Sequence, residues 1–175
     1  MINRLSLEAT SVSWPCERGL FRRKPREVRR DYDGLIVDGE PLQRLVGLGD
    51  SFFVTPLSAE SPLDAAFAVE VVDALLGVGP GHYRDGCTPI LVCGMDNDVY
   101  CGALGVLVVL EPEVVTWQLA WHLIDGNGSV EGHNESSAQE WTLHFERAAY
   151  EELLGAARSR FGAVAGGVDA WPFVP

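Results

Sequence analysis

The densest group of potentially reactive side chains lies in the segment HYRDGCTPILVCGMDNDVYCG, residues 82–102. It contains residues of the types that bind metals or act as nucleophiles, namely His82, Cys87, Cys93, Asp96, Asp98 and Cys101. Zinc prefers thiolate, imidazole and carboxylate ligands, and its structural sites typically contain a Cys-x-x-Cys turn. The segment has no such turn. We therefore expect either no cofactor, with these side chains in the core and in turns, or a zinc site assembled from several turns.

In the zinc alternative, Cys93 and Cys101 flank a predicted hairpin and approach each other across it. Asp96 or Asp98 then supplies an oxygen ligand, and His82 or Cys87 completes the site. A third alternative is a reactive thiol, which requires a cationic neighbour to lower its pKa. The two aspartates would act in the opposite direction, so a reactive thiol is the least favoured alternative.

A second group of polar side chains alternates along two predicted strands, 114–122 and 140–146. A hairpin closing near His122 and Glu140 would place these two residues side by side, with Gln118 near His144. A histidine beside a carboxylate is suited to general acid and base catalysis. The same alternation is expected for the solvent face of an antiparallel sheet or for a surface that binds a partner. The pattern alone favours the solvent face.

An arginine-rich segment, residues 18–30, holds seven of the thirteen cations and a single acid. Its candidate interaction residues are Arg22, Arg23, Arg26, Arg29 and Arg30. Arginine suits phosphate recognition because its guanidinium is planar and forked. Pro25 favours an irregular loop, however, and a cationic loop is attracted to acidic protein surfaces. We expect the segment to lie against the acidic body of its own chain or of a second copy.

The remaining charge is acidic and excludes several classes of protein. Residues 31–146 contain nineteen acids and two cations, and the whole chain carries a net charge of −12. This balance opposes general affinity for nucleic acids or anionic membranes. The start of the chain lacks the apolar run of a secretory signal, and the longest apolar stretch, 99–110, is too short to span a bilayer. We expect a cytoplasmic protein whose cysteines are reduced.

Local patterns in the first half predict a strand over 2–14, a short strand over 35–37, a short helix over 41–48 and a strand over 51–57. Asp38-Gly39 is a turn signal. The strongest pattern predicts a helix over 62–76, with Ser61 as its N-cap, Pro62 at its first position and Gly77 at its C-terminal cap. Apolar residues cover most of this helix, so a sheet or a partner chain must pack on it.

The second half predicts four successive strands, 90–94, 103–110, 114–122 and 140–146, followed by a helix over 147–161. A polar loop, 125–137, joins the last two strands. Alternation places six large side chains on one face of these two strands: Trp117, Leu119, Trp121, Trp141, Leu143 and Phe145. We expect this face to supply the core.

The length of 175 residues suits one domain. The elements together predict an α+β fold, an antiparallel β-meander of four to six strands with two main helices packed on it. The arginine-rich segment is expected to be a loop and residues 162–175 a C-terminal tail.

The segment VCGMDNDVYCGALGVLV resembles a motif of small uncharacterised actinobacterial proteins, which reads roughly V-C-x-x-C-G-D-x-G-C-G-A-x-x-V and precedes a tryptophan-containing strand. The matching positions are Val92, Cys93, Asp98, Cys101, Gly102, Ala103 and Val106. Members are sometimes labelled oxidoreductases. Here Asp96 stands in place of the motif's middle cysteine and Asn97 in place of the glycine after it. The resemblance therefore implies that dithiol redox chemistry is lost, whereas a metal ligand is retained.

These observations predict a non-enzymatic protein–protein interaction module with an acidic surface, in an adaptor or immunity-like role. We expect self-association through the apolar helix or an aromatic sheet edge. The first alternative is a metal- or thiol-dependent, oxidoreductase-like enzyme centred on the Cys93–Cys101 hairpin. The second alternative is anion or nucleic-acid binding through the arginine-rich segment.

Overall fold

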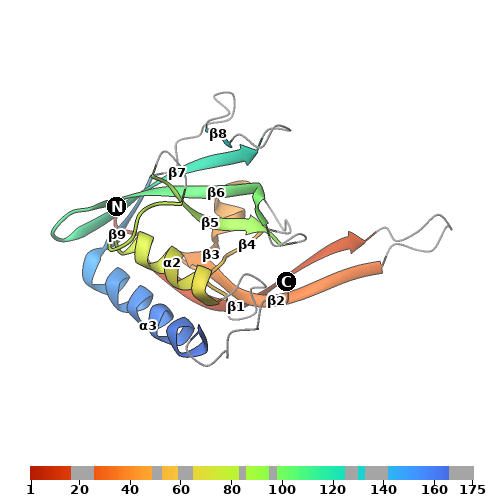
Figure 1. Cartoon of the computed structure of the whole chain (residues 1–175), viewed down its shortest axis with the longest axis horizontal. Helices are drawn as coiled ribbons and strands as arrows, with labels where there is room; N and C mark the ends of the chain where they lie inside the picture. The colour runs from red at the N-terminus through yellow and green to blue at the C-terminus, as the bar shows by residue number, and fades with distance from the viewer. Residues whose placement is uncertain are drawn as a thin grey trace, which may run out of the picture.

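The computed structural model describes residues 1–16, 26–48, 53–58, 65–82, 86–94, 98–124, 130–132 and 142–165. Two antiparallel sheets and two long helices surround a shared hydrophobic core (Figure 1). The fold is α+β, as the sequence predicts. No helix in these ranges has the length and apolar character needed to cross a membrane.

The larger sheet forms the body of the molecule. Its strands are β4 (Phe53–Val54), β5 (Thr88–Cys93), β6 (Asp98–Leu110), β7 (Val114–Ile124), β8 (Val130–Gly132) and β9 (Thr142–Glu146). The order is β4-β5-β6-β7, and β7 pairs with β8 through residues 122–124 and with β9 through residues 114–118. The predicted meander is confirmed. The strand β8 lies inside the segment predicted as a polar loop, so that part of the prediction was wrong.

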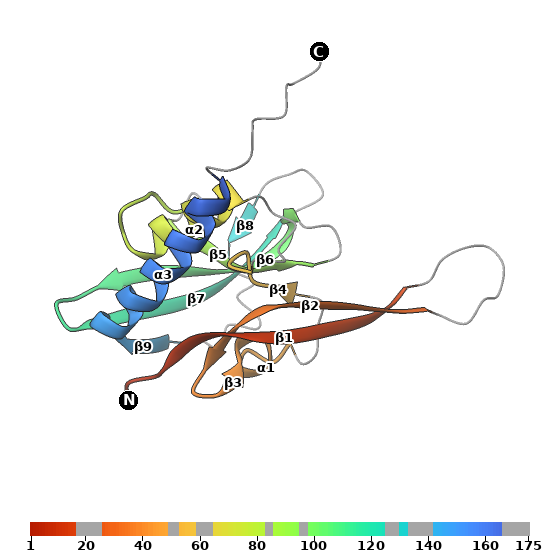
Figure 2. The ribbon, with the colours of Figure 1, turned by 90° about the horizontal axis from the view of Figure 1, so that it is seen from below.

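The helices α2 (Ala65–Leu75) and α3 (Arg147–Ala165) pack against each other and against one face of this sheet (Figure 2). Both confirm predicted helices. Gly77 ends α2 with a φ of 72°, the left-handed conformation that favours glycine. Ser61 and Pro62 lie outside the described residues. The apolar face of α2 is covered by α3 and the sheet within the same chain, which removes the basis for self-association through this helix.

An aromatic cluster holds the sheet to both helices. Trp117 of β7 meets Phe145 of β9 edge to face, with ring centroids 5.0 Å apart. The Trp117 indole Nε1 donates a hydrogen bond to the Tyr150 hydroxyl, which donates in turn to the Leu75 carbonyl oxygen of α2; both bonds measure 3.0 Å. The predicted aromatic face is thus confirmed at Trp117, Leu143 and Phe145, which are all buried. The side chains of Trp121 and Trp141 lie outside the described residues.

The smaller sheet contains β1 (Leu5–Cys16), β2 (Arg26–Val37) and β3 (Glu40–Pro41), followed by the short helix α1 (Leu42–Leu45). β1 and β2 pair along their full length, from Leu5 opposite Val37 to Cys16 opposite Arg26. The predicted Asp38-Gly39 turn is confirmed, with φ values of 53° and 86°. Two predictions were wrong: the strands do not form a single sheet, and residues 26–30 belong to a strand rather than to an irregular loop.

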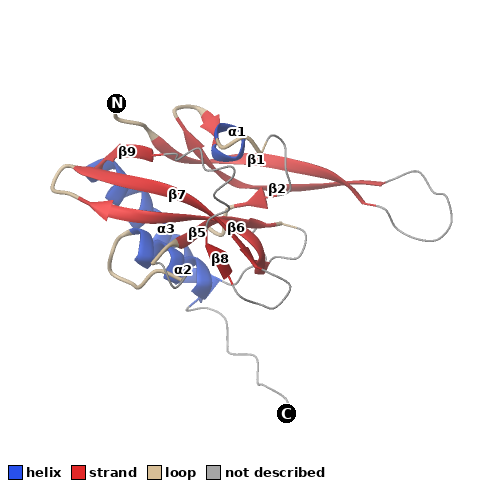
Figure 3. Cartoon of the chain, turned by 90° about the horizontal axis from the view of Figure 1, so that it is seen from above, coloured by secondary structure: helices blue, strands red, loops and turns tan. Residues whose placement is uncertain are grey.

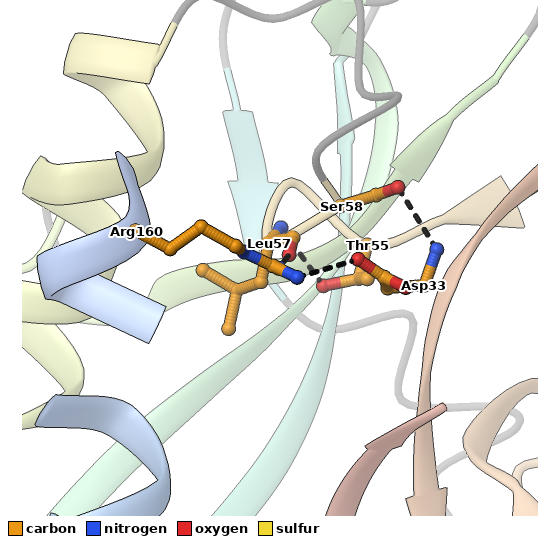
Figure 4. Close-up of polar contacts among 5 residues, drawn as sticks. All are labelled: Asp33, Thr55, Leu57, Ser58 and Arg160. Atoms are coloured by element: carbon orange, nitrogen blue, oxygen red, sulfur yellow. Dashed lines mark hydrogen bonds and ion pairs between the residues drawn. The ribbon is translucent and has the colours of Figure 1, made fainter. Parts of the chain in front are cut away.

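The smaller sheet is fastened to the body at several points near its base. The backbone N–H of Asn3 donates to the His144 carbonyl oxygen of β9, and the Gln43 side chain of α1 donates to the Phe53 carbonyl oxygen of β4. Figure 4 shows a further cluster, in which Arg160 of α3 donates to the Asp33 carboxylate at 2.9 Å and to the Leu57 carbonyl oxygen at 3.0 Å. Leu35 and Val37 of β2 are buried in the shared core.

From Asp33, where Arg160 holds it, the β1–β2 hairpin leaves the body (Figure 2). We call residues 9–16 of β1 and 26–33 of β2 the hairpin arm. Figure 2 and Figure 3 show the hairpin arm projecting past the end of the body as a two-stranded ribbon. The helices and the main sheet end before it does.

Candidate interaction surfaces

In the ladder of the β5–β6 hairpin, Cys93 pairs with Asp98 and not with Cys101. Val92 pairs with Ala103, but the next residue, Cys93, pairs with Asp98, so the ladder changes register and residues 99–102 have no partner on β5. The Cys93 side chain is fully buried and Cys87 is nearly so. Asp96 lies outside the described residues, as do the side chains of Asp98 and Cys101. Among the described side chains no three metal-binding groups converge.

His82 lies in the turn between α2 and β5, where its ring packs edge-on against Phe67, with centroids 5.1 Å apart. Its backbone N–H donates to the Cys87 carbonyl oxygen, and its Nε2 is 3.9 Å from the Glu70 carboxylate. Burial lowers the pKa of this imidazole, and the Glu70 charge opposes that effect. The turn requires a glycine, because a Cβ on Gly81 would lie 1.9 Å from a carbonyl oxygen.

The polar face of β7 and β9 has a different register from the predicted one. His144 lies opposite Thr116, and the Thr116 hydroxyl is 3.0 Å from the His144 Nδ1. Gln118 lies opposite Thr142, whereas His122 lies opposite Gly132 of β8. The predicted register, which sets His144 opposite Gln118, was therefore wrong by two residues. The predicted pair of His122 and Glu140 stays a prediction, because Glu140 and the His122 side chain lie outside the described residues. The hydroxyl–imidazole contact orients His144 without supplying the carboxylate that acid–base chemistry would use.

The arginine-rich segment is described only in part. Arg22 and Arg23 lie outside the described residues, as do the side chains of Arg26 and Arg30, although the backbones of these last two belong to β2. The Arg29 side chain is 70% exposed, and its Nε donates to Asp31 of the same strand at 3.1 Å. Arg29 therefore does not lie against the acidic body of its own chain, and for the other arginines of the segment that expectation stays a prediction. Contact with a second chain stays a prediction.

The outer edge of β1 carries backbone groups that face away from β2. The Asp38 N–H donates to the Arg4 carbonyl oxygen at 2.9 Å, so Arg4 points its backbone groups toward β2. Because this direction alternates along an antiparallel strand, the odd-numbered residues of β1 point theirs away. β1 is the edge of its sheet, and within the described ranges no strand pairs with these groups.

An acidic groove of about 630 Å³ lies between the N-terminal segment and α3. Its walls include Ile2 and Leu153, and its rim includes Asp38, Glu146 and Glu152. Backbone and side-chain N–H groups of Arg4 and Asn3 hold the pKa of Asp38 below its usual value, so this carboxyl stays ionised. The groove is a local part of the acidic surface that the composition predicts.

Neither the β1 edge nor the groove was singled out from the sequence. The edge depends on the order of strands in a sheet, which residue types do not specify. The groove joins residues from both ends of the chain. Comparison of the chain with protein-family models, with curated proteins and with solved structures gave no match.

Proposed function

We propose that this protein is a non-enzymatic protein–protein interaction module, in an adaptor or immunity-like role, and that the hairpin arm is its principal contact. The observation that carries the proposal is the projection of a two-stranded ribbon beyond a body whose core is already closed (Figure 3). The ribbon offers two recognition elements, an unpaired strand edge on β1 and the exposed cation of Arg29 on β2.

The hairpin arm contributes little to the core of its own chain. A two-stranded hairpin in water is at best marginally stable and gains stability from a third strand or a covering layer. Leu35 and Val37 of β2 lie at the base, and among the described side chains of the arm only Tyr32 is buried. A bound partner would therefore supply the packing that the arm does not obtain from the body.

The proposal is tested by comparing the wild-type chain with the Arg29→Glu variant. Each is expressed with a tag in the source cells, and recovered proteins are quantified. Any protein whose recovery depends on Arg29 is then purified, and its affinity is measured in solution. We expect roughly tenfold weaker binding for Arg29→Glu, the size of a lost charge-assisted contact. Arg44→Glu, at an exposed arginine of α1, is the matched control and should bind normally. Equal binding by both variants and the wild type would contradict the proposal.

Nucleic-acid binding is a second candidate because a two-stranded β-ribbon fits the major groove of DNA, and β2 carries Arg26, Arg29 and Arg30. The net charge of −12 opposes it. Titration of the purified protein with duplex DNA at low salt separates the two candidates. Binding that weakens steeply with salt and disappears in Arg29→Glu would replace our proposal with this one.

The metal- or thiol-dependent alternative is tested by elemental analysis of the purified protein and by alkylation of the folded protein. Cys87 and Cys93 are buried, so we expect both thiols to react slowly until the chain unfolds. We also expect no stoichiometric zinc or iron, because Cys93 lies opposite Asp98 and not Cys101. Stoichiometric metal that disappears in a Cys93→Ala, Cys101→Ala variant would restore the alternative.

A further inference from the structure

We infer that the hairpin arm binds a second copy of the same chain, through antiparallel pairing of the two β1 edges. The product is a four-stranded ribbon in the order β2-β1-β1-β2, with a two-fold axis through its centre. This inference rests on the proposed function, because it uses the same arm and names its partner.

The backbone of the hairpin arm supplies the hydrogen-bonding groups. Odd-numbered residues of β1 point their N–H and C=O groups away from β2, and within the described part of the chain no strand pairs with those of Ala9, Ser11 and Ser13. The same rule holds on β2, where the backbone N–H of the odd-numbered Asp33 points away from β1 and donates to the Ser58 hydroxyl. The alternation is therefore observed on both strands of the hairpin.

This edge lacks the features that usually prevent strand addition. Edge strands are commonly protected by lysines, inward-pointing charges, bulges or prolines. Between Leu5 and Cys16 the only charged residue is Glu8, and Pro15 lies near the outer end of the strand. The twelve pairs with β2 run without a bulge, and Ala9 and Ser11 are exposed. Residues 9–13 thus form a regular, uncharged and accessible template.

A second copy fits this template by register and by charge. In antiparallel pairing of β1 with itself, odd residues meet odd residues, so free donors meet free acceptors. With the two-fold axis at residue 9, 10 or 11, odd residues meet odd residues and the two Glu8 carboxylates do not face each other. The hairpin arm contains three cations and three acids, so two arms do not repel as two acidic bodies would.

The shape of the molecule permits this contact. The hairpin arm extends past the body, so two arms can lie side by side with the bodies held apart (Figure 3). Pairing of one surface with the same surface of a second copy closes after two subunits and does not propagate. The inference therefore specifies dimers and excludes filaments.

The test is sedimentation velocity of the full-length protein from micromolar to hundred-micromolar concentrations. We compare the wild type with Ser11→Pro, which removes an outward N–H and leaves the ladder to β2 unbroken. Ser11→Ala keeps that N–H and is the matched control. A second variant, Ala9→Lys with Ser11→Lys, places like charges across the proposed interface. Near-UV circular dichroism of the tryptophans establishes that each variant keeps a folded body.

We expect a monomer–dimer equilibrium for the wild type and for Ser11→Ala. Dimerisation should weaken at least tenfold in Ser11→Pro and in the double lysine variant, and high salt should partly restore the lysine variant. A wild type that is monomeric at every concentration would overturn the inference, as would a dimer unaffected by both variants. If the wild type is monomeric but still captures another protein through Arg29, this inference fails and the proposed function stands. If neither occurs, both fail.

Discussion

The body and the hairpin arm are both built on antiparallel ladders, yet they differ in what surrounds the ladder. In the body, β6 has strands on both sides, and α2 and α3 cover one face of the sheet. In the hairpin arm, β1 has a strand on one side only, and the ribbon leaves the body without a covering layer. The central strands of the body are paired and covered within the chain, whereas the outward backbone groups of β1 in the arm have no strand partner among the described residues.

This difference separates the residues that stabilise the fold from those available for recognition. The polar groups at the centre of the body already have partners, as the chain of hydrogen bonds from Trp117 through Tyr150 to Leu75 shows. Polar groups whose hydrogen bonds are already formed within the chain are not available to bind another protein. Among the described residues, by contrast, no strand pairs with the outward backbone groups of Ala9, Ser11 and Ser13 in β1.

Hydrogen exchange should show the largest contrast. Amides of β6 between 104 and 107 are expected to exchange only through global unfolding, whereas amides of the hairpin arm exchange through local opening. We expect the two sets to differ by about a thousandfold or more in a dilute sample. If the arm pairs with a second copy, its odd-numbered amides should gain protection as concentration rises. Equal protection in dilute solution would show that arm and body unfold as one unit.

Truncation of the central tryptophan tests the self-sufficiency of the body. Trp117→Ala removes a fully buried side chain and its hydrogen bond to Tyr150, and should lower the free energy of unfolding by about 3–5 kcal/mol. Denaturant titration measures the loss. Trp117→Phe keeps most of the volume and should cost less. Ser11→Ala in the arm, by contrast, should leave the free energy of unfolding nearly unchanged.

The turn before β5 should make the stability of the body depend on pH. Because burial lowers the pKa of His82, its stabilising effect is complete above the unfolded value of about 6.5 and is lost as pH falls through the folded value. We expect the free energy of unfolding to fall as the solution is acidified below neutrality. His82→Gln should remove this part of the slope. An identical pH profile for the variant would show that the ring does not titrate differently in the folded state.

Gly155, inside α3, offers the smallest effect, and it is stabilising. A Cβ built there meets no atom within 4 Å, and alanine loses less backbone entropy than glycine when a helix forms. Gly155→Ala should therefore raise the free energy of unfolding by about 0.5–1 kcal/mol. Gly162→Ala, equally unobstructed but closer to the helix end, is the control and should gain less. If Gly155→Ala instead lowers the free energy of unfolding, α3 contacts a second chain at this position in the assembled protein.

The sequence predicted the parts of the fold whose residues repeat with one clear period. α2 and the buried side of β7 were predicted because apolar residues recur on one face, and burial selects that face. The arm was mispredicted at residues 26–30, because the sequence there has no hydrophobic period. There the pairing with β1 determines the conformation, and Arg-rich composition says nothing about it.

The candidate sites depended on register, which residue types specify only weakly. The predicted pairing of His144 with Gln118 missed the observed pairing with Thr116 by two residues, a shift that keeps every side chain on the same face. The alternation of polar and apolar residues shows only which face a side chain occupies, so it cannot detect a shift of two residues. Similarly, the spacing of Cys93 and Cys101 indicated a symmetric hairpin, but the change of register after Val92 places Asp98 opposite Cys93.

The contacts of Arg160 give the hairpin arm a fixed direction. Its guanidinium donates hydrogen bonds to the carboxylate of Asp33, at the base of the hairpin arm, and to the Leu57 carbonyl oxygen (Figure 4). The Ser58 hydroxyl accepts a hydrogen bond from the Asp33 backbone N–H. The base of the arm is therefore held against α3, and the arm is not a flexible linker. A partner bound along it would meet the body at a defined angle, and little orientational freedom would remain to be lost on binding.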